Sequence, residues 1–397
     1  MANKKRLQKR TKRIVLFGSV PIIVAMVVIG VLAVVRAAPS SFEVETGTKS
    51  SNAEQVSDAT ASGGSAVKFK ATGGSQPTGC PATKRTITAS DVTNLVNSGY
   101  PANTQVFVPG GPDPWGGCFP GAGNTGIPSG TTLTAYTGSC NITTPNTVID
   151  SKTITCGITV TASNVIIRNS KITNGNLNVN SGSLSIVDTE IDLGNNPDDE
   201  GVKGSNLTIT RANMYGGKRQ VWCSSCTVQD SYLHDQLADP SGLTHESAAR
   251  ADQGTTLLHN TLLCNAPNYP PDAGCSANQT GYPDFSTTKN NRFEKNFYMA
   301  TTGGYCSYGG QTNGKPYSND ATNATNIVSL NNVFQRGTNA NDRTSIALTD
   351  KRRYTCGYYG VTTAYDSTKS GFQFTGNMWD DGLLFSSDTT YPYGAFY

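Results

Sequence analysis

The sequence predicts an all-β protein in which short parallel strands wind into a parallel β-helix. One pattern recurs nine times: an apolar residue, a small polar residue two or three places on, and a bulky residue five places on. The first four intervals between repeats are 19, 19, 23 and 19 residues. A period of this length is typical of solenoids, whose units bury their apolar sides only by stacking on neighbours. The repeats begin at Val148, Ile167, Ile186, Ile209, Val228, Leu258, Phe293, Ser329 and Phe374.

The repeats themselves predict strands rather than helices. Residues 165–172 and 184–191 are short β-branched runs that end in Asn, Asp, Ser or Thr. No run between them has the length and 3.6-residue spacing of a helix, and the leucine-plus-helix signature of leucine-rich repeats is absent. Roughly 20 residues a coil leave room for three short strands and three bends, with successive coils ~4.8 Å apart.

Polar residues that recur at one position of the repeat predict turns. Short polar side chains at bends bond the backbone, and positions in register from coil to coil form ladders. Three repeats depart from the Asp/Asn position, at Arg211, Lys295 and Gly376. The residues that hold it are Asp150, Asn169, Asp188, Asp230 and Asn260.

The amino terminus predicts export and a membrane anchor. Seven Lys/Arg residues within 1–13 precede an uncharged stretch at 14–35. As a helix, at ~1.5 Å per residue, this stretch would span about 33 Å, enough for a ~30 Å hydrocarbon core. Positive charge before the span predicts a cytoplasmic tail and an extracellular body. The segment Val35-Arg36-Ala37-Ala38 could serve as a signal cleavage site, which leaves open a cleaved signal and a secreted protein.

Four regions follow from this organisation. They are a basic cytoplasmic tail (1–13), a transmembrane signal anchor (14–35), a flexible linker rich in Ser, Thr and Gly (36–79) and an extracellular domain (80–397). Within the last, Ser90 can cap a short apolar helix that Gly99 ends. We expect this helix to cover the first coil.

Charge makes nucleic acid an unlikely partner of the exported domain. The chain has 31 basic and 28 acidic residues, and residues 1–36 hold eight of the basic ones and no acid. The remainder therefore carries a net charge of −5. Phosphate contacts need a basic stripe, so we expect no nucleic acid binding.

Ten cysteines, all from Cys80 onward, predict disulfides in an exported domain. Cys223 and Cys226 have redox-motif spacing, but they lack a thioredoxin-like context and a second CxxC pair, so a local bridge is favoured. Proximity suggests Cys264 with Cys275 and Cys140 with Cys156, although spacing alone does not derive the pairing. Cys306 and Cys356 lie in the long later loops, and a bridge between them would tie these loops together.

Four segments carry a family resemblance: CFPGAGNTGIPSGTTLT (118–134), NVIIRNS (164–170), LHNTLLC (258–264) and CGYYG (356–360). Over roughly 80–385 the chain resembles exported bacterial right-handed parallel β-helix proteins of the pectin-lyase-like superfamily. The resemblance implies polysaccharide cleavage or binding, often of acidic glycans and sometimes with Ca²⁺. The Trp-Ile-Asp-His and Arg-x-Pro-x-x-Arg segments of pectate lyases are absent, so no catalytic residue is carried over.

Charged insertions suggest where chemistry would lie. Comparable offsets within successive repeats predict that these loops lie at one edge, a coil apart. In a lyase, calcium would neutralise a uronate and a cation or histidine would remove the adjacent proton. In a hydrolase, two carboxyls would flank the glycosidic bond. The alternative is that these charged loops are exposed to solvent and have no catalytic role. The candidates are Lys218, Arg219, His234, Asp239 and His245 for catalysis and Asp198, Asp199 and Glu200 for calcium.

Aromatic residues in the later loops suggest a place for sugar rings. Tyrosine combines an apolar face with a polar tip, which suits either sugar stacking or packing around a disulfide. Two functions remain open: an anchored extracellular enzyme that acts on a polysaccharide, lyase ahead of hydrolase, or a non-catalytic surface protein that binds glycans. The substrate-binding candidates are Tyr305, Tyr308, Tyr358 and Tyr359.

Overall fold

The computed structural model describes the backbone of 53–57 and 65–69, and residues 79–88, 102–310, 314–318, 324–337 and 356–387 in full. The chain divides into two compact units, Met1–Gln76 and Pro77–Tyr397.

The described part of the first unit is a small antiparallel hairpin. Strand β1 (Ala53–Ser57) pairs with β2 (Ser65–Phe69) inside the stretch predicted to be a linker. The predicted anchor at 14–35 and the predicted capping helix at 90–99 lie outside the described residues. Among the residues that are described, no helix has the length and apolarity to cross a membrane.

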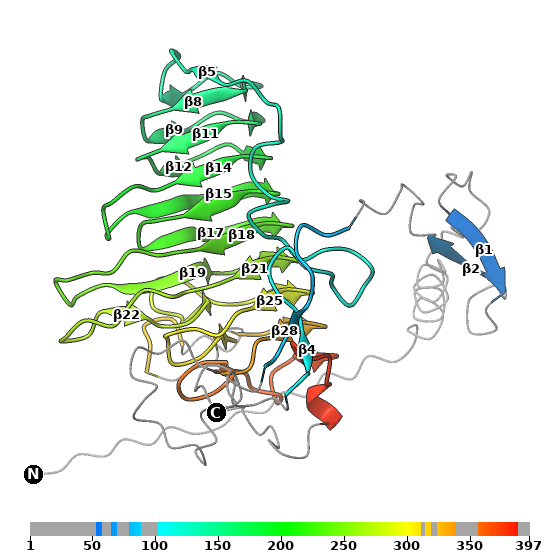
Figure 1. Ribbon diagram of the computed structural model, residues 1–397. Coiled ribbons are helices and arrows are strands. Elements are labelled where there is room, and N and C mark those ends of the chain that lie inside the picture. Colours follow the sequence, from blue (N-terminus) through cyan, green and yellow to red (C-terminus); the bar gives the residue numbers. More distant parts are fainter. Residues whose placement is uncertain are drawn as a thin grey trace, which may run out of the picture. The chain divides into compact units, whose positions relative to one another are not determined.

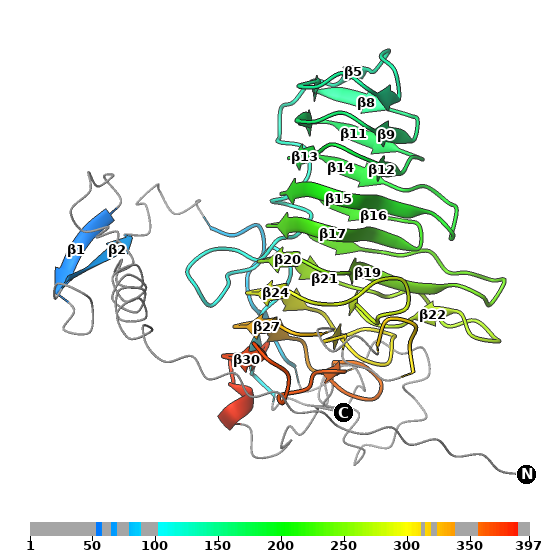
Figure 2. The ribbon, with the colours of Figure 1, turned by 180° about the vertical axis from the view of Figure 1, so that it is seen from behind.

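The described part of the second unit is all-β, and most of its strands fall into three series to which successive coils contribute (Figures 1 and 2). One coil contributes two short strands, β22 (Gly274–Cys275) and β23 (Gln279–Thr280), to the first series. The first and second series form one 17-stranded sheet and the third forms a 10-stranded sheet.

The first series contains β6 (Asn141–Ile142), β9 (Ile158–Val160), β12 (Leu177–Val179), the first parts of β15 (Glu200–Thr210) and β17 (Arg219–Gln229), β19 (His245–Ala251), β22 (Gly274–Cys275), β23 (Gln279–Thr280), β26 (Ser307–Tyr308) and β29 (Thr362–Thr363). The second contains β7 (Val148–Asp150), β10 (Val165–Arg168), β13 (Leu184–Val187), the second parts of β15 and β17, β20 (Thr255–Leu258), β24 (Asn291–Glu294), β27 (Ile327–Leu330) and β30 (Gln373–Thr375). The third contains β5 (Thr134–Ala135), β8 (Lys152–Ile154), β11 (Lys171–Thr173), β14 (Glu190–Asp192), β16 (Asn213–Tyr215), β18 (Tyr232–His234), β21 (Thr261–Leu262), β25 (Phe297–Tyr298), β28 (Val333–Phe334) and β31 (Met378–Trp379). Outside the three series are the antiparallel pair β3 (Arg85–Thr86) and β4 (Gln105–Val106) and the short 3₁₀ turn η6 (Phe385–Ser387).

Consecutive strands of each series pair in parallel, as in a β-helix. Ile167, for example, pairs with Ile149 of the preceding coil and with Ile186 of the next. Two predicted repeat starts are wrong by one residue. Ile149 and Leu257 hold the inward position in place of Val148, which is 51% exposed, and Leu258, because apolar side chains also occur on the outward side of these strands.

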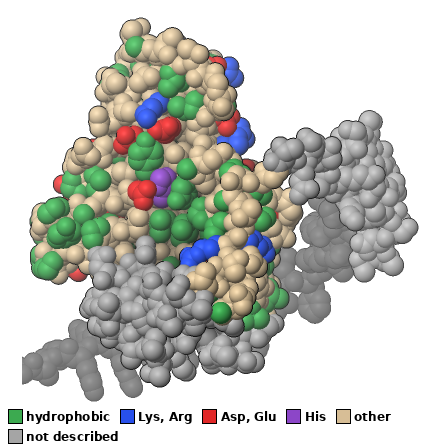
Figure 3. Space-filling view, in the orientation of Figure 1, with side chains coloured by type: hydrophobic (Ala, Val, Ile, Leu, Met, Phe, Trp, Pro, Cys, Tyr) green, Lys and Arg blue, Asp and Glu red, His purple; other side chains and the backbone are tan. Residues whose placement is uncertain are grey.

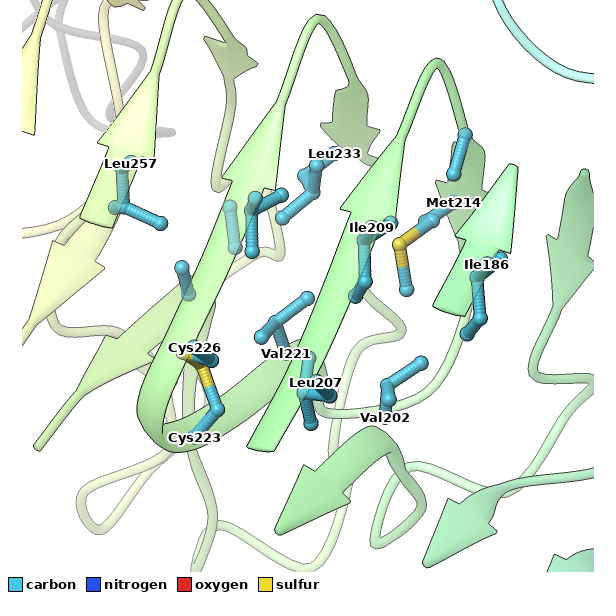
Figure 4. Packing of buried hydrophobic residues seen from close by; sticks show 14 of the residues in the cluster. Ile186, Val202, Leu207, Ile209, Met214, Val221, Cys223, Cys226, Leu233 and Leu257 are labelled. Atoms are coloured by element: carbon cyan, nitrogen blue, oxygen red, sulfur yellow. A yellow bond between two sulfur atoms is a disulfide. The ribbon is translucent and has the colours of Figure 1, made fainter. Parts of the chain in front are cut away.

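The interior is a continuous column of aliphatic side chains. Ile209 lies between Ile186 and Val228, and all three are fully buried. Figure 4 shows such side chains from neighbouring strands pointing into the same space, together with the Cys223–Cys226 disulfide. Farther along, Phe334 and Trp379 fill the bulky position five residues after the repeat start, as the repeat predicts.

The corner between the second and third series has a left-handed backbone in every coil. Its φ values lie between 49° and 70°, a region that favours Asn, Asp and Gly. Arg211, Lys295 and Gly376 therefore belong to the recurring position, whereas Asp150 and Asn260 are its neighbours. The corner residues are Ser151, Asn169, Asp188, Arg211, Asp230, His259, Lys295, Asn331 and Gly376.

The residue after this corner builds a buried asparagine ladder. The side-chain oxygen of Asn296 accepts the amide N–H of Asn260 at 2.9 Å and its side-chain N–H₂ at 3.0 Å. Asn332 does the same for Asn296, and Asn377 for Asn332. Asn260, Asn296 and Asn332 are fully buried, so the predicted bonding of short polar side chains to the backbone at bends is confirmed.

The segment before the first coil runs along the third series and is fastened at a corner. Phe119 packs against Phe297, with ring centroids 4.9 Å apart. His259 binds Asp113 of this segment (Nε2–Oδ2 3.2 Å) and Asp230 of the preceding coil (Nδ1–Oδ1 2.6 Å). The left-handed corner at His259 places its ring between these two carboxylates.

All ten cysteines form disulfides. The bridges Cys140–Cys156, Cys223–Cys226, Cys264–Cys275 and Cys306–Cys356 agree with the pairs suggested from the sequence. The fifth, Cys80–Cys118, fastens the start of the second unit to the segment along the third series.

Candidate functional site

The loops between the third and first series stack at one edge, as the repeat offsets predict. The amide of Lys218 donates to the carbonyl of Asp199 at 2.7 Å, and that of Gly216 donates to the carbonyl of Asp235 at 2.9 Å. The loops of successive coils are therefore neighbours. Their side chains, however, turn to different partners.

Arg219 is buried in a polar network at this edge. Its guanidinium binds Glu200 (3.0 Å), the hydroxyl of Ser247 (2.8 Å) and the carbonyl of His245 (3.2 Å). A buried cation with a carboxylate partner holds neighbouring coils together, and each of its three nitrogens here donates one hydrogen bond within the protein.

Asp239 closes its own loop. Its carboxylate accepts the hydroxyl of Ser241 and the amides of Ser241, Leu243 and Thr244 at 2.8–3.0 Å. The Ser241 hydroxyl and these amides lower the pKa of Asp239. The carboxylate of Asp239 is therefore ionised in the folded protein, and its hydrogen bonds hold the loop that precedes His245.

His234 lies on the outward face of the third series, at the end of β18 where one of the stacked loops begins. Its ring binds Asn213 (Nε2–Oδ1 2.9 Å) and Asp235 (Nδ1–Oδ2 2.7 Å) and stacks on Tyr232, with centroids 3.9 Å apart. Both ring nitrogens are thus engaged. Figure 3 shows basic, acidic and histidine side chains close together on one face of the molecule.

The residues predicted to hold calcium do not converge. Asp199 accepts from the side chain of Asn196 at 2.9 Å, whereas Glu200 binds Lys203 at 2.9 Å and Arg219. Within the described ranges, no group of three or more His, Cys, Asp and Glu side chains is placed to hold a metal ion.

The four predicted tyrosines do come together. Ring centroids are 6.1 Å apart for Tyr305 and Tyr308, 5.9 Å for Tyr305 and Tyr359, and 4.9 Å for Tyr358 and Tyr359. The Cys306–Cys356 disulfide joins their two loops, and the amides of Tyr358 and Tyr359 donate to Gly303 and Gly304. Tyr308 is buried, and this burial raises the pKa of its hydroxyl. Tyr359, in contrast, is 65% exposed.

A pocket of about 690 Å³ lies beside these tyrosines. Its lining combines the catalytic candidate His245 with two substrate-binding candidates, Tyr358 and Tyr359. Within it, His245 Nε2 lies 3.1 Å from Asp272 Oδ2, and both side chains are open to solvent. The volume is in the range of small-molecule sites, and three tyrosines with a few polar groups suit a polyhydroxylated ligand. The lining residues are His245, Asn268–Ser276, Thr302, Gly304, Tyr358 and Tyr359.

Tyr269 and Asp272 also line the pocket, although neither is among the residues predicted for the site. The amide of Asp272 donates to Gly242 at 3.0 Å, and the Cys264–Cys275 disulfide closes the loop. The one signal available was the predicted Cys264–Cys275 bridge, which marks a closed insertion in the coil of His245.

Glu246, the neighbour of His245, points away from the pocket and is fully buried. One oxygen accepts the hydroxyl of Thr244, and the other has no hydrogen-bond partner. Burial raises the pKa of Glu246, against the lowering effect of Thr244. The folded state therefore binds the proton of this carboxyl more tightly than the unfolded state does.

We expect Glu246→Gln to stabilise the protein at pH 7 by about 1 kcal/mol. A carboxyl whose pKa is raised on folding contributes its full stabilisation below the unfolded pKa of 4.5. This stabilisation is lost as the pH rises through the folded pKa. Urea titrations between pH 4 and pH 8 measure the difference. Glu294→Gln is the matched control, because Glu294 binds Arg292 at the surface. A variant that is less stable than the wild type at pH 7 would contradict the assignment.

The described residues define an all-β protein of stacked parallel coils, braced by five disulfides, with a polar and aromatic pocket on its side. Comparison with protein-family models, with curated proteins and with solved structures gave no match.

Proposed function

We propose that this chain is a membrane-anchored extracellular protein, a right-handed β-helix of the pectin-lyase-like superfamily, that binds a polysaccharide in the pocket beside His245. The observation that carries the proposal is the combination of Tyr269, Tyr358 and Tyr359 with the polar pair His245 and Asp272 in one pocket. Aromatic faces stack on sugar rings, and a few polar groups fix their orientation.

Two features support the placement outside the cell. The basic tail and the uncharged stretch at 14–35 suit a single-pass anchor with the carboxyl-terminal unit outside. Five disulfides suit an oxidising compartment.

We expect Tyr359→Ala to weaken polysaccharide binding by about tenfold, which corresponds to ~1.4 kcal/mol. Tyr359 is 65% exposed at the pocket, so its removal takes away a stacking face without opening the core. Affinity electrophoresis of the full chain in gels that contain polygalacturonate, alginate, hyaluronan or xylan measures the effect. Val148→Ala, at another exposed apolar position, is the control. No retardation of the wild type by any of the four polymers would refute the proposal.

Cleavage is a second candidate, and the His245–Asp272 pair favours it. With Asp272 on Nε2, the Nδ1 atom of His245 would accept the C5 proton of a bound uronate, as the base of a lyase does. The C4–C5 double bond would form as the C4–O4 glycosidic bond breaks, and the departing oxygen would take a proton from water. Absorbance of unsaturated ends would report that reaction. Product formation that His245→Gln abolishes while binding persists would establish a lyase. Binding without product would establish the alternative, a non-catalytic adhesin or structural glycan-binding protein.

A further inference from the structure

The pocket beside His245 presents aromatic rings and a carboxylate to a ligand. Its described lining includes Tyr269, Tyr358, Tyr359 and Asp272, and none of the described lining residues is lysine or arginine. Asp272 is the one acidic residue among them. Its side chain contacts His245 and is 82% exposed, so the carboxylate can accept a further donor from a ligand.

Asp272 and Tyr269 are held together on a short hairpin. The amide of Tyr269 donates to the carbonyl of Ala273 at 2.9 Å, and the amide of Ala273 donates back at 2.8 Å. This antiparallel bridge leaves Asp272 in the turn between them. The Cys264–Cys275 disulfide closes the insertion that contains the hairpin. The carboxylate therefore has a fixed place relative to an aromatic side chain.

The other aromatic wall offers ring faces in two directions. The rings of Tyr358 and Tyr359 lie 4.9 Å apart at an angle of 89°. A cation within about 6 Å of a tyrosine ring is attracted by the negative face of that ring. Arg219, which donates to the carbonyl of His245, is paired with Glu200, so its charge is compensated. The ring faces and the carboxylate together suit a positively charged group.

We propose that the pocket selects an amino sugar, whose ammonium group binds Asp272 and lies against the tyrosine rings. This inference rests on the pocket being a polysaccharide site, and it names the class of sugar. A hydrogen bond between ionised groups is roughly twice as strong as one between neutral groups. An acetylated amine has no charge and forms the weaker bond. A uronate would bring a second carboxylate to Asp272, and like charges at close range are unfavourable.

Calorimetry with the full-length protein at pH 6 tests the inference. The probes are the tetrasaccharides of glucosamine, N-acetylglucosamine, xylose and galacturonate. The first two share one sugar ring and differ in the acetyl group that removes the charge. We expect the glucosamine tetramer to bind about tenfold more tightly than the acetylated one, and the galacturonate tetramer to bind most weakly. Asp272→Asn should remove this preference and leave the affinity for the acetylated tetramer unchanged.

Control variants separate the pocket from the overall charge of the protein. Residues 37–397 carry a net charge of −5, which attracts any cationic ligand. Glu294→Gln removes one negative charge from β24, where Glu294 binds Arg292, and should keep the preference. Tyr359→Ala should weaken the binding of every tetramer, because stacking serves all sugar rings. Asp272→Asn retains the backbone bond to Gly242, so we expect the loop to keep its structure.

Any of four results would overturn the inference and leave the polysaccharide proposal standing. They are equal affinity for the glucosamine and acetylated tetramers, tightest binding of the galacturonate tetramer, a preference that persists in Asp272→Asn, and a preference that is lost in Glu294→Gln. Tightest binding of galacturonate would also favour the lyase candidate. If neither the tetrasaccharides nor the four polymers bind, the polysaccharide proposal itself fails and the inference fails with it.

Discussion

Replacing Asn296 by alanine should lower the free energy of unfolding by about 3–5 kcal/mol, because it breaks the buried ladder in the middle. The substitution removes the acceptor of the Asn260 amide and the donor to the carbonyl of Leu257. Both groups are inside the stack, and water does not replace a partner there. Each buried group that loses its partner costs about 1–3 kcal/mol, and a small cavity adds to this.

Urea titration of the wild type and of Asn296→Ala measures this difference. Asn178→Ala is the matched control, since Asn178 is half exposed on the outward side of β12. We expect the control to change stability by less than about 0.5 kcal/mol. A loss below about 1 kcal/mol in Asn296→Ala would show that the ladder is not a main support of the fold.

The protein should lose about 3 kcal/mol of stability between pH 6.5 and pH 9 because of His259. Burial alone would lower the pKa of His259, but the hydrogen bonds and charges of Asp113 and Asp230 raise it to about 9. A base whose pKa is raised on folding contributes its full stabilisation below the unfolded pKa, which is 6.5 for histidine. That contribution disappears as pH rises through the folded value. Loss of the positive charge also leaves Asp113 and Asp230 facing each other.

His259→Asn tests this directly, because asparagine tolerates the left-handed corner but carries no charge. We expect the variant to be about 3 kcal/mol less stable than the wild type at pH 6 and equal to it at pH 10. Lys295→Asn replaces a cation at the corner of the next coil and should retain the wild-type pH dependence. Parallel curves for the wild type and His259→Asn across this range would contradict the assignment.

The sequence was sufficient to predict the coils because each coil repeats one backbone conformation. Ile167, Ile186, Ile209 and Val228 hold the same inward position, and stacking requires an apolar residue there. The repeat starts predicted at Val148 and Leu258 were wrong because the strands are short, so one outward apolar residue resembles an inward one in the sequence. Arg211 and Lys295 look like exceptions in the sequence, since their side chains differ while their φ values do not.

The candidate site was predictable only in part, because contacts between loops are not periodic. His245, Tyr358 and Tyr359 were among the predicted residues, and the pocket contains all three. Arg219 and Asp239 turned out to hold the loops through ion pairing and backbone bonds. Asp272 went unnoticed because its partner His245 lies 27 residues away in the chain, and no repeat relates the two positions.

Hydrogen exchange with and without the polymer that binds most tightly tests the central claim most directly, since it locates the site without a mutation. We predict slower exchange in the two pocket loops, 268–276 and 356–360, and unchanged exchange on the outward face of the third series around Tyr215 and His234. Protection confined to that outward face, with both loops unaffected, would contradict the pocket as the site of polysaccharide binding.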